Sequence, residues 1–275
     1  MASDNTDDII QYYSQNRENQ RHQTQQLEFL IMEKVLGTYL RQKQLKILEI
    51  GAGAGYYTQR LAQMGHEIVA LEPVEKLIQA NQEVCQKLGF QDQIRWIHSD
   101  ARKMREFLKE SDEFDVILNM GPLYHLTEKT ERVQLLKMSL EYLKKEGLHM
   151  ATSLSRVGYL SYVLARQPES LLVNPEGFRS VMTEGFDETH PRDGTFRGYF
   201  ADLMGLSQEL GEAGLSLQTL HVLDPGIGGR DDIFNQLSED QKAIWVEVLF
   251  ALSADPSLWG SGRTWLTLSV KQQKE

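Results

Sequence analysis

Short apolar runs alternate with longer amphipathic stretches over residues 46–155. The runs that predict buried strands cover residues 46–50, 66–72, 94–101, 114–121 and 148–154. Between them, as over 74–88 and 131–145, apolar residues recur every three or four positions, which is the spacing of a helix that packs on a sheet. Strands that alternate with helices predict an α/β fold with a doubly wound, mostly parallel sheet.

The regular alternation stops after residue 156. Residues 157–197 contain Leu- and Tyr-rich helical pieces that are interrupted by prolines, and a second irregular stretch holds a predicted helix over 239–251. Strands are still predicted over 215–223 and, with clear alternation, over 264–271. We therefore expect a seven-stranded sheet with an antiparallel last strand and helical cap insertions.

This pattern divides the chain into four parts. We expect an N-terminal helical lid over 1–44, a core over 45–156, a cap insertion over 157–197, and a completion of the core over 198–275 with a second insertion at 226–262. Ligands bind at the carboxyl ends of the strands in open α/β sheets. We expect the lid and both insertions to form one cover over those ends.

A glycine-rich turn follows the first strand. Gly51, Gly53 and Gly55 come directly after it, and the helical pattern starts again near Thr58. Glycines let such a turn fold tightly and let a ligand touch the backbone, and the next helix offers its free N–H groups. The dinucleotide fingerprint G-x-G-x-x-G needs a glycine at position 56, which is Tyr56. The alternative interpretation is a tight turn without a ligand.

The stretch from Glu49 to Gly55 reads Glu-x-Gly-x-Gly-x-Gly and resembles motif I of the class I S-adenosylmethionine (SAM)-dependent methyltransferases. The resemblance covers residues 45–155 and implies a Rossmann-like core that binds SAM and releases S-adenosylhomocysteine. It assigns Glu72 to the ribose hydroxyls and Asp100 to the adenine amino group. The cofactor-binding residues that it implies in the core are Glu49, Gly51, Ala52, Gly53, Gly55, Tyr56, Thr58, Glu72, Pro73, Asp100, Ala101, Asn119, Met120 and Gly121.

The lid holds further candidates for the cofactor. In many small-molecule methyltransferases the N-terminal helices close over SAM, and this resemblance implicates Tyr12, Tyr13 and Arg21. Aromatic rings suit a sulfonium and an Arg suits a carboxylate, the two charges of the methionine end. The interpretation that these side chains do not touch the cofactor stays open.

Two residues after the fourth strand are candidates for catalysis. In this family the segment that holds Tyr124 and His125 lies beside the transferred methyl group. The protein mainly aligns the reactants, and a base is needed only when the acceptor must lose a proton. With an unperturbed pKa of about 6.5, His125 is the candidate base. Alternatively, His125 only shapes the pocket and Tyr124 forms a wall against the methyl group.

The net charge and the cysteine content argue against nucleic-acid partners and against an oxidising compartment. The net charge of −10 opposes binding to nucleic acid. Nucleic-acid adenine methyltransferases often carry Pro-Pro-Tyr where Met120 and Gly121 follow Asn119. The single cysteine, Cys85, allows no intramolecular disulfide and favours a reducing compartment. We expect a cytoplasmic protein without a signal peptide, membrane span or metal, as a monomer or homodimer.

The leading hypothesis is SAM-dependent methylation of a nitrogen or oxygen of a small molecule or short peptide. The segment after the fourth strand also resembles a bacterial branch of small-molecule and natural-product methyltransferases. One alternative is an inactive SAM-binding protein with a regulatory or scaffold role, and another is a methyltransferase of protein or RNA. If several of the cap's acidic residues line the pocket, a cationic amine is the favoured acceptor.

Overall fold

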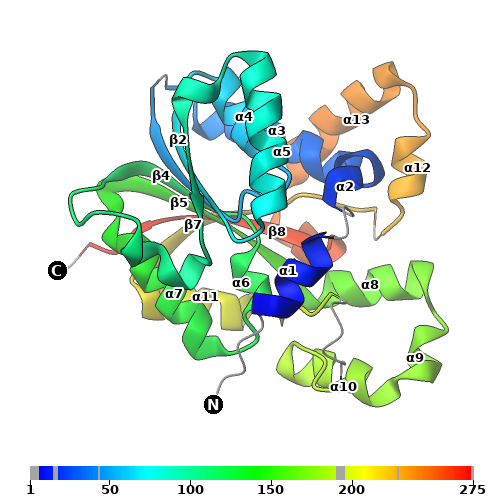
Figure 1. Ribbon diagram of the computed structural model, residues 1–275. Helices are drawn as coiled ribbons and strands as arrows, with labels where there is room; N and C mark the ends of the chain where they lie inside the picture. Colours follow the sequence, from blue (N-terminus) through cyan, green and yellow to red (C-terminus); the bar gives the residue numbers. More distant parts are fainter. Residues whose placement is uncertain (1–5, 15–17, 43, 190–195, 228, 274–275) are drawn as a thin grey trace.

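The computed structural model describes residues 6–14, 18–42, 44–189, 196–227 and 229–273 (Figure 1). One sheet runs through the molecule with helices on both faces. Its strands are β1 (Lys46–Ile50), β2 (Glu67–Glu72), β3 (Ile94–His98), β4 (Phe114–Asn119), β5 (Leu143–Ser155), β6 (Phe200–Ala201), β7 (Leu215–Val222) and β8 (Thr264–Lys271). They lie in the order β3-β2-β1-β4-β5-β8-β7, and the short β6 pairs with β5 outside this path.

The last strand runs against its neighbours. β8 lies between β5 and β7 and pairs with both in antiparallel register. The pairs among β1 to β5 are parallel. The structure therefore confirms the doubly wound sheet with an antiparallel last strand that the sequence predicts.

The strand order reverses between β1 and β4. The chain builds β1, β2 and β3 toward one edge and then returns to place β4 on the other side of β1. In open α/β sheets, ligands bind in the crevice at the carboxyl ends of such a pair of strands. Gly51 and Met120 follow β1 and β4 directly, so the glycine turn lies at this crevice.

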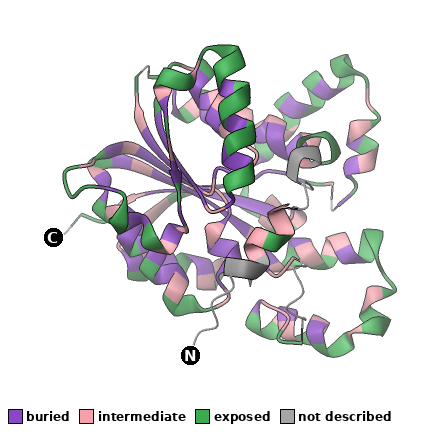
Figure 2. Cartoon of the chain, viewed as in Figure 1, coloured by how far each residue is buried: buried purple, intermediate pink, exposed green. Residues whose placement is uncertain are grey.

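Helices bury apolar residues on each face of the sheet. Side chains alternate between the faces along a strand, so on β1 Ile47 enters one core and Leu48 and Ile50 enter the other. Figure 2 shows the buried strands and the buried inner sides of the helices. The helices of these layers are α3 (Gln26–Tyr39), α4 (Tyr56–Gln63), α5 (Glu75–Leu88), α6 (Pro122–His125), α7 (Lys129–Glu141) and α11 (Leu203–Ala213), with the short η1 (Gln91–Gln93) and η2 (Ala101–Glu106).

The remaining helices belong to the lid and the two insertions. They are α1 (Thr6–Ser14), α2 (Glu18–Thr24), α8 (Arg156–Arg166), α9 (Ser170–Val173), α10 (Pro175–Glu184), α12 (Asp231–Asn235), α13 (Glu239–Leu252) and η3 (Pro256–Ser261). α12 contacts α2 and α3, α13 contacts α3, and α8 contacts η3 (Figure 1). Within the described residues, no helix combines the length and the apolar character that a membrane crossing requires.

The boundary between α7 and β5 differs from the sequence prediction. The helix predicted over 131–145 ends at Glu141, and β5 begins at Leu143 rather than at residue 148. Leu143 pairs with Phe114, and Lys144 Nζ donates to Asp115 Oδ1 at 2.6 Å, so tertiary contacts extend the strand over polar residues. Between β3 and β4, residues 101–106 form the short 3₁₀ helix η2.

Candidate functional site

A cavity of about 1120 Å³, including the space at its mouth, opens at the carboxyl ends of β1, β2 and β4. This is enough space for a ligand of the size of a nucleoside with a side chain. Many of the residues expected at the site line it. They are Tyr13, Arg21, Gly51, Ala52, Gly53, Tyr56, Glu72, Pro73, Asp100, Ala101, Met120, Gly121, Tyr124 and His125.

The remaining candidates lie around the cavity rather than on its wall. Glu49 is fully buried, and its Oε2 accepts from Thr58 Oγ1 at 2.6 Å, which ties β1 to α4. Asn119 is also fully buried, and its amide has no hydrogen-bond partner among the described residues. Gly55 forms the N-cap of α4, and Tyr12 packs on Tyr13.

Burial changes the ionisation of Glu49. Desolvation raises its pKa to about 8, the charge of Glu72 adds to this effect, and the hydrogen bond from Thr58 opposes it. Near pH 7 the carboxyl is mostly protonated. Its Oε1 has no hydrogen-bond partner among the described residues.

The glycine turn is held close to its neighbours. Gly51 has a φ of +80°, and a Cβ there would lie 2.7 Å from Pro122 Cδ and 3.0 Å from the carbonyl oxygen of Met120. A Cβ on Gly55 would meet the Asn81 side chain at 2.0 Å. Asn81 Nδ2 also donates to the carbonyl of Gly53 at 2.9 Å. Asn81 thus fixes the turn from α5, a role that the sequence pattern did not reveal.

Glu72 is oriented by backbone groups at the end of β2. Its Oε2 accepts from the N–H of Gly53 at 2.8 Å, and its Oε1 accepts from the N–H of Val74 at 3.0 Å. The carboxylate therefore lies where a ribose bound over the glycine turn would present its hydroxyls.

The Asp100 side chain is the N-cap of η2. It accepts from the backbone N–H of Arg102 at 2.7 Å and from two nitrogens of the same guanidinium, Nε at 3.0 Å and Nη2 at 2.8 Å. Arg102 also lines the cavity and forms an ion pair with Glu131. The sequence pattern does not single out Arg102, whose guanidinium stands between Asp100, the expected adenine contact, and Glu131.

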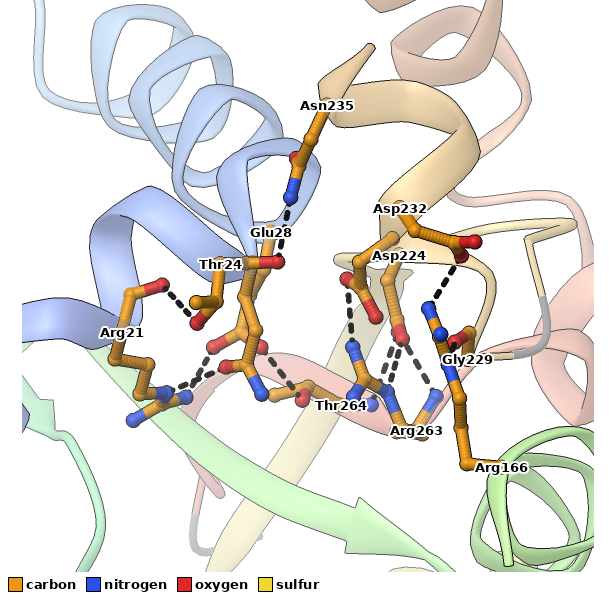
Figure 3. Close-up of polar contacts among 12 residues, drawn as sticks. Arg21, Thr24, Glu28, Arg166, Asp224, Gly229, Asp232, Asn235, Arg263 and Thr264 are labelled. Atoms are coloured by element: carbon orange, nitrogen blue, oxygen red, sulfur yellow. Dashed lines mark hydrogen bonds and ion pairs between the residues drawn. The ribbon is translucent and has the colours of Figure 1, made fainter. Parts of the chain in front are cut away.

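An ion pair with a buried carboxylate borders the cavity on the lid side. Arg21 forms an ion pair with Glu28 and donates from Nε to Gln25 Oε1 at 2.7 Å. Glu28 has 2% of its surface exposed and accepts from Thr264 Oγ1 at 3.1 Å (Figure 3). A cation beside an anion is complementary to the zwitterionic methionine end of SAM. Glu28 carried no signal in the sequence, because its partners lie on other elements.

His125 also lines the cavity. Its Nε2 lies 2.7 Å from the hydroxyl of Tyr13, and the two rings meet edge to face at 5.4 Å. Burial lowers the His125 pKa to about 4, a hydrogen bond to the backbone of Arg197 opposes the shift, and the charge of Arg21 adds to it. The imidazole is therefore neutral at pH 7.

Aromatic rings surround this histidine. Tyr124 lies 4.7 Å and Phe196 5.5 Å from it, measured between ring centroids. Phe196 also contacts Tyr12 at 5.7 Å. The expected pair Tyr124 and His125 thus meets the lid residues Tyr12 and Tyr13 in one cluster, and Phe196 is an addition that the sequence did not indicate.

The two insertions do not form part of the cavity wall. Among the described residues of 157–197 and 226–262, none lines the cavity. Arg166 of α8 pairs with Asp232 of α12, so the two insertions touch each other (Figure 3). The single cover over the strand ends, and the acidic pocket lining from the cap, stay predictions.

The residues at the cavity fit SAM. A turn that a Cβ would obstruct, a carboxylate at the end of β2 and a paired cation and anion at the lid match its backbone contacts, its ribose and its methionine end. Among the described residues, no group of three or more His, Cys, Asp or Glu side chains is placed to hold a metal.

Comparisons with known proteins point to the same family. Residues 47–147 match the sequence model of a family described as "Methyltransferase domain". A curated relative, the ubiquinone biosynthesis O-methyltransferase of Ruegeria sp. (strain TM1040), is 28% identical over 112 residues, which are 41% of this chain and 42% of the relative. The chain thus spans less than half the length of the first curated relatives that it matches.

Solved structures share the fold. One is the Burkholderia thailandensis 1,6-didemethyltoxoflavin-N1-methyltransferase with bound 1,6-didemethyltoxoflavin and S-adenosylhomocysteine, with a TM-score of 0.58 and 13% identity over 98% of this chain and 87% of that chain. Another is the [4+2]-cyclase SpnF, with a TM-score of 0.56 and 13% identity over 89% and 80% of the two chains. The family match spans strands and turns that form much of the cavity, so residues 47–147 form a methyltransferase domain, and the chain has the Rossmann-like fold of the class I SAM-dependent methyltransferases.

Proposed function

We propose that the protein is an enzyme that transfers a methyl group from SAM to a nitrogen or oxygen of a small molecule or short peptide. The observation that carries this proposal is the neutral, buried His125 in the same cavity as the glycine turn and Glu72. The names of the curated relatives, which are O-methyltransferases, favour oxygen. We also propose that the protein belongs to a bacterial branch of natural-product methyltransferases.

In this proposal, different residues along the cavity hold different parts of SAM. SAM supplies a methyl group that its sulfonium has already activated. The backbone of the glycine turn and Glu72 hold the nucleoside, while Asp100 and Ala101 border the adenine. Arg21 and Glu28 receive the charged methionine end. The aromatic cluster excludes water and aligns the acceptor, which accounts for much of the rate in such a displacement.

His125 has a defined role when the acceptor carries a proton. Because burial keeps its pKa far below 7, one nitrogen of its ring is unprotonated at neutral pH. That nitrogen faces the cavity where an acceptor meets the methyl group. His125 is therefore the proposed general base, and Tyr124 is the proposed wall beside the methyl group.

The test is methyl transfer itself, because the fold also belongs to a protein described as a [4+2]-cyclase. Purified protein is incubated with SAM labelled in its methyl group and a bacterial metabolite extract, and labelled products are found by mass spectrometry. We expect labelled small molecules that disappear with Glu72→Ala. SAM binding without any labelled product would support the inactive binding protein, and label on protein or RNA would support the macromolecular alternative.

A further inference from the structure

The side chain of Tyr13 fills the place beside His125 where an acceptor would lie. Building on the proposed function, we propose that the acceptor is an aryl hydroxyl, and that Tyr13 occupies its position until it binds. A tyrosine side chain is itself a phenol. Its hydroxyl is 2.7 Å from His125 Nε2, and both residues line the cavity that holds the cofactor residues.

The hydrogen bonds of His125 define which group donates. The hydrogen bond to the backbone of Arg197 favours the charged ring, which is the effect of a ring N–H that donates to a carbonyl. Because Nε2 faces Tyr13, this N–H is on Nδ1. Nε2 then has a lone pair that accepts the Tyr13 O–H. An aryl hydroxyl in the same place would make the same bond.

The surrounding rings suit a flat aromatic group. Tyr12 meets the Tyr13 ring edge to face at 5.0 Å with an interplanar angle of 88°, and His125 does so at 5.4 Å and 83°. Edge-to-face contacts at such distances stabilise aromatic pairs. Phe196 and Tyr124 complete the cluster. The geometry that receives the tyrosine ring is therefore a receptor for a substituted benzene ring.

The charges at this end of the cavity do not favour an ammonium acceptor. The described carboxylates of the cavity wall, Glu28, Glu72 and Asp100, all accept hydrogen bonds from other groups. Among the described charged groups, Arg21 is the one that acts on the His125 pKa, and it is a cation. A neutral hydroxyl that loses its proton is favoured here over an acceptor that arrives with a positive charge.

Tyr13 is placed so that it can leave. It lies on α1, and no described residue of α1 belongs to either hydrophobic core. α1 can therefore move without unpacking either hydrophobic core. The arriving hydroxyl replaces that of Tyr13 at His125 Nε2.

The reaction moves one proton and one methyl group. The aryl hydroxyl gives its proton to His125 Nε2, and an oxygen lone pair forms the new O–CH₃ bond. The S–CH₃ bond breaks, and its electron pair stays on sulfur as a neutral thioether. The products are an aryl methyl ether and S-adenosylhomocysteine, and the proton on His125 passes to water.

The experiment uses 4-methylphenol, which is the tyrosine side chain as a free molecule. Full-length protein is saturated with S-adenosylhomocysteine, and 4-methylphenol or benzylamine is titrated by calorimetry into the wild type, Tyr13→Ala and Tyr39→Phe. Tyr39→Phe is the matched control, since the Tyr39 hydroxyl also lies near a histidine, His221, but away from the cavity. With SAM, 4-methoxytoluene is sought by mass spectrometry.

We expect Tyr13→Ala to bind 4-methylphenol about tenfold more tightly than the wild type, because no resident ring has to be displaced. Tyr39→Phe should bind 4-methylphenol with the affinity of the wild type. Tyr13→Ala should not raise the affinity for benzylamine. With SAM, 4-methoxytoluene should form. If Tyr13→Ala does not fold, Tyr13→Phe replaces it and should show a gain of a few-fold, since it frees Nε2.

The proposal would be overturned by unchanged 4-methylphenol affinity in the Tyr13 variant, or by methylation of benzylamine but not 4-methylphenol. Both outcomes require that S-adenosylhomocysteine binds. Absence of that binding would instead contradict the proposed function, so the two failures are distinguishable.

Discussion

The two ends of the cavity are built in different ways. At the cofactor end, contacts are local: Glu72 accepts from Gly53 and from Val74, all on two neighbouring β-strand ends. At the acceptor end, Tyr13 and His125 are 112 residues apart and meet through a helix outside both hydrophobic cores. The cofactor end changes only if the sheet changes, whereas the acceptor end can open while the sheet stays folded.

This difference fits the chemistry of the two ligands. A cofactor that is the same in every turnover is served by a fixed site on strand ends, which position side chains more accurately than loops do. An acceptor has to enter and leave, so a mobile cover over its site is an advantage. The four changes below test the comparison, from the largest expected effect to the smallest.

The largest effect is expected from Glu49, below the cofactor end. Its pKa of about 8 means that the folded protein keeps a proton that the unfolded chain releases above its ordinary pKa of 4.5. Stability is thus full below pH 4.5 and falls as the pH rises to 8, by up to about 5 kcal/mol. Glu49→Gln should be more stable than the wild type at pH 8 and similar at pH 5 in urea unfolding. Equal changes at both pH values, or the same pattern in the exposed control Glu67→Gln, would contradict this account.

His125, at the acceptor end, should respond to pH with the opposite sign. Between pH 6.5 and 4 the unfolded chain binds a proton that the buried ring does not, so stability falls as the pH falls, by up to about 3 kcal/mol. His125→Gln should reduce this acid-side loss in unfolding titrations, whereas the exposed control His98→Gln should not. A His125→Gln protein with the acid sensitivity of the wild type would show that this ring is not buried in its neutral form.

Gly51→Ala should damage the cofactor end through steric contact. Gly51 and Gly65 both have positive φ, +80° and +87°, but a Cβ meets Pro122 at Gly51 and nothing within 4 Å at Gly65. Backbone strain of about 1–2 kcal/mol is common to both variants. We expect Gly51→Ala to weaken SAM binding about a hundredfold and Gly65→Ala to leave it unchanged in calorimetry. Equal affinities would mean that SAM does not approach this turn.

Glu72→Ala tests the ribose contact. Loss of a hydrogen-bonded carboxylate should weaken cofactor binding by about 1.5–3 kcal/mol. Circular dichroism should show a folded protein, because the substitution leaves the strand intact. The exposed Glu75, three residues along, provides the matched control Glu75→Ala, which should bind SAM normally. An unchanged dissociation constant for Glu72→Ala would show that the ribose lies elsewhere.

The same contrast explains what the sequence could predict. The strand at 46–50, the glycine turn and the last strand at 264–271 were found because hydrophobic periodicity and glycine spacing are local signals. Glu28, Asn81 and Phe196 were missed because each acts through partners on other elements. The early start of β5 was missed for a related reason, since Lys144 is held in the strand by Asp115.

The central claim is that the cavity is a SAM site, and calorimetric titration tests it most directly. Wild-type protein is titrated with SAM, S-adenosylhomocysteine and, as a competitor for the same type of fold, NAD. We predict binding of both adenosyl ligands at one site per chain, and no heat with NAD. Absence of binding by SAM and S-adenosylhomocysteine, together with binding of NAD, would contradict the account.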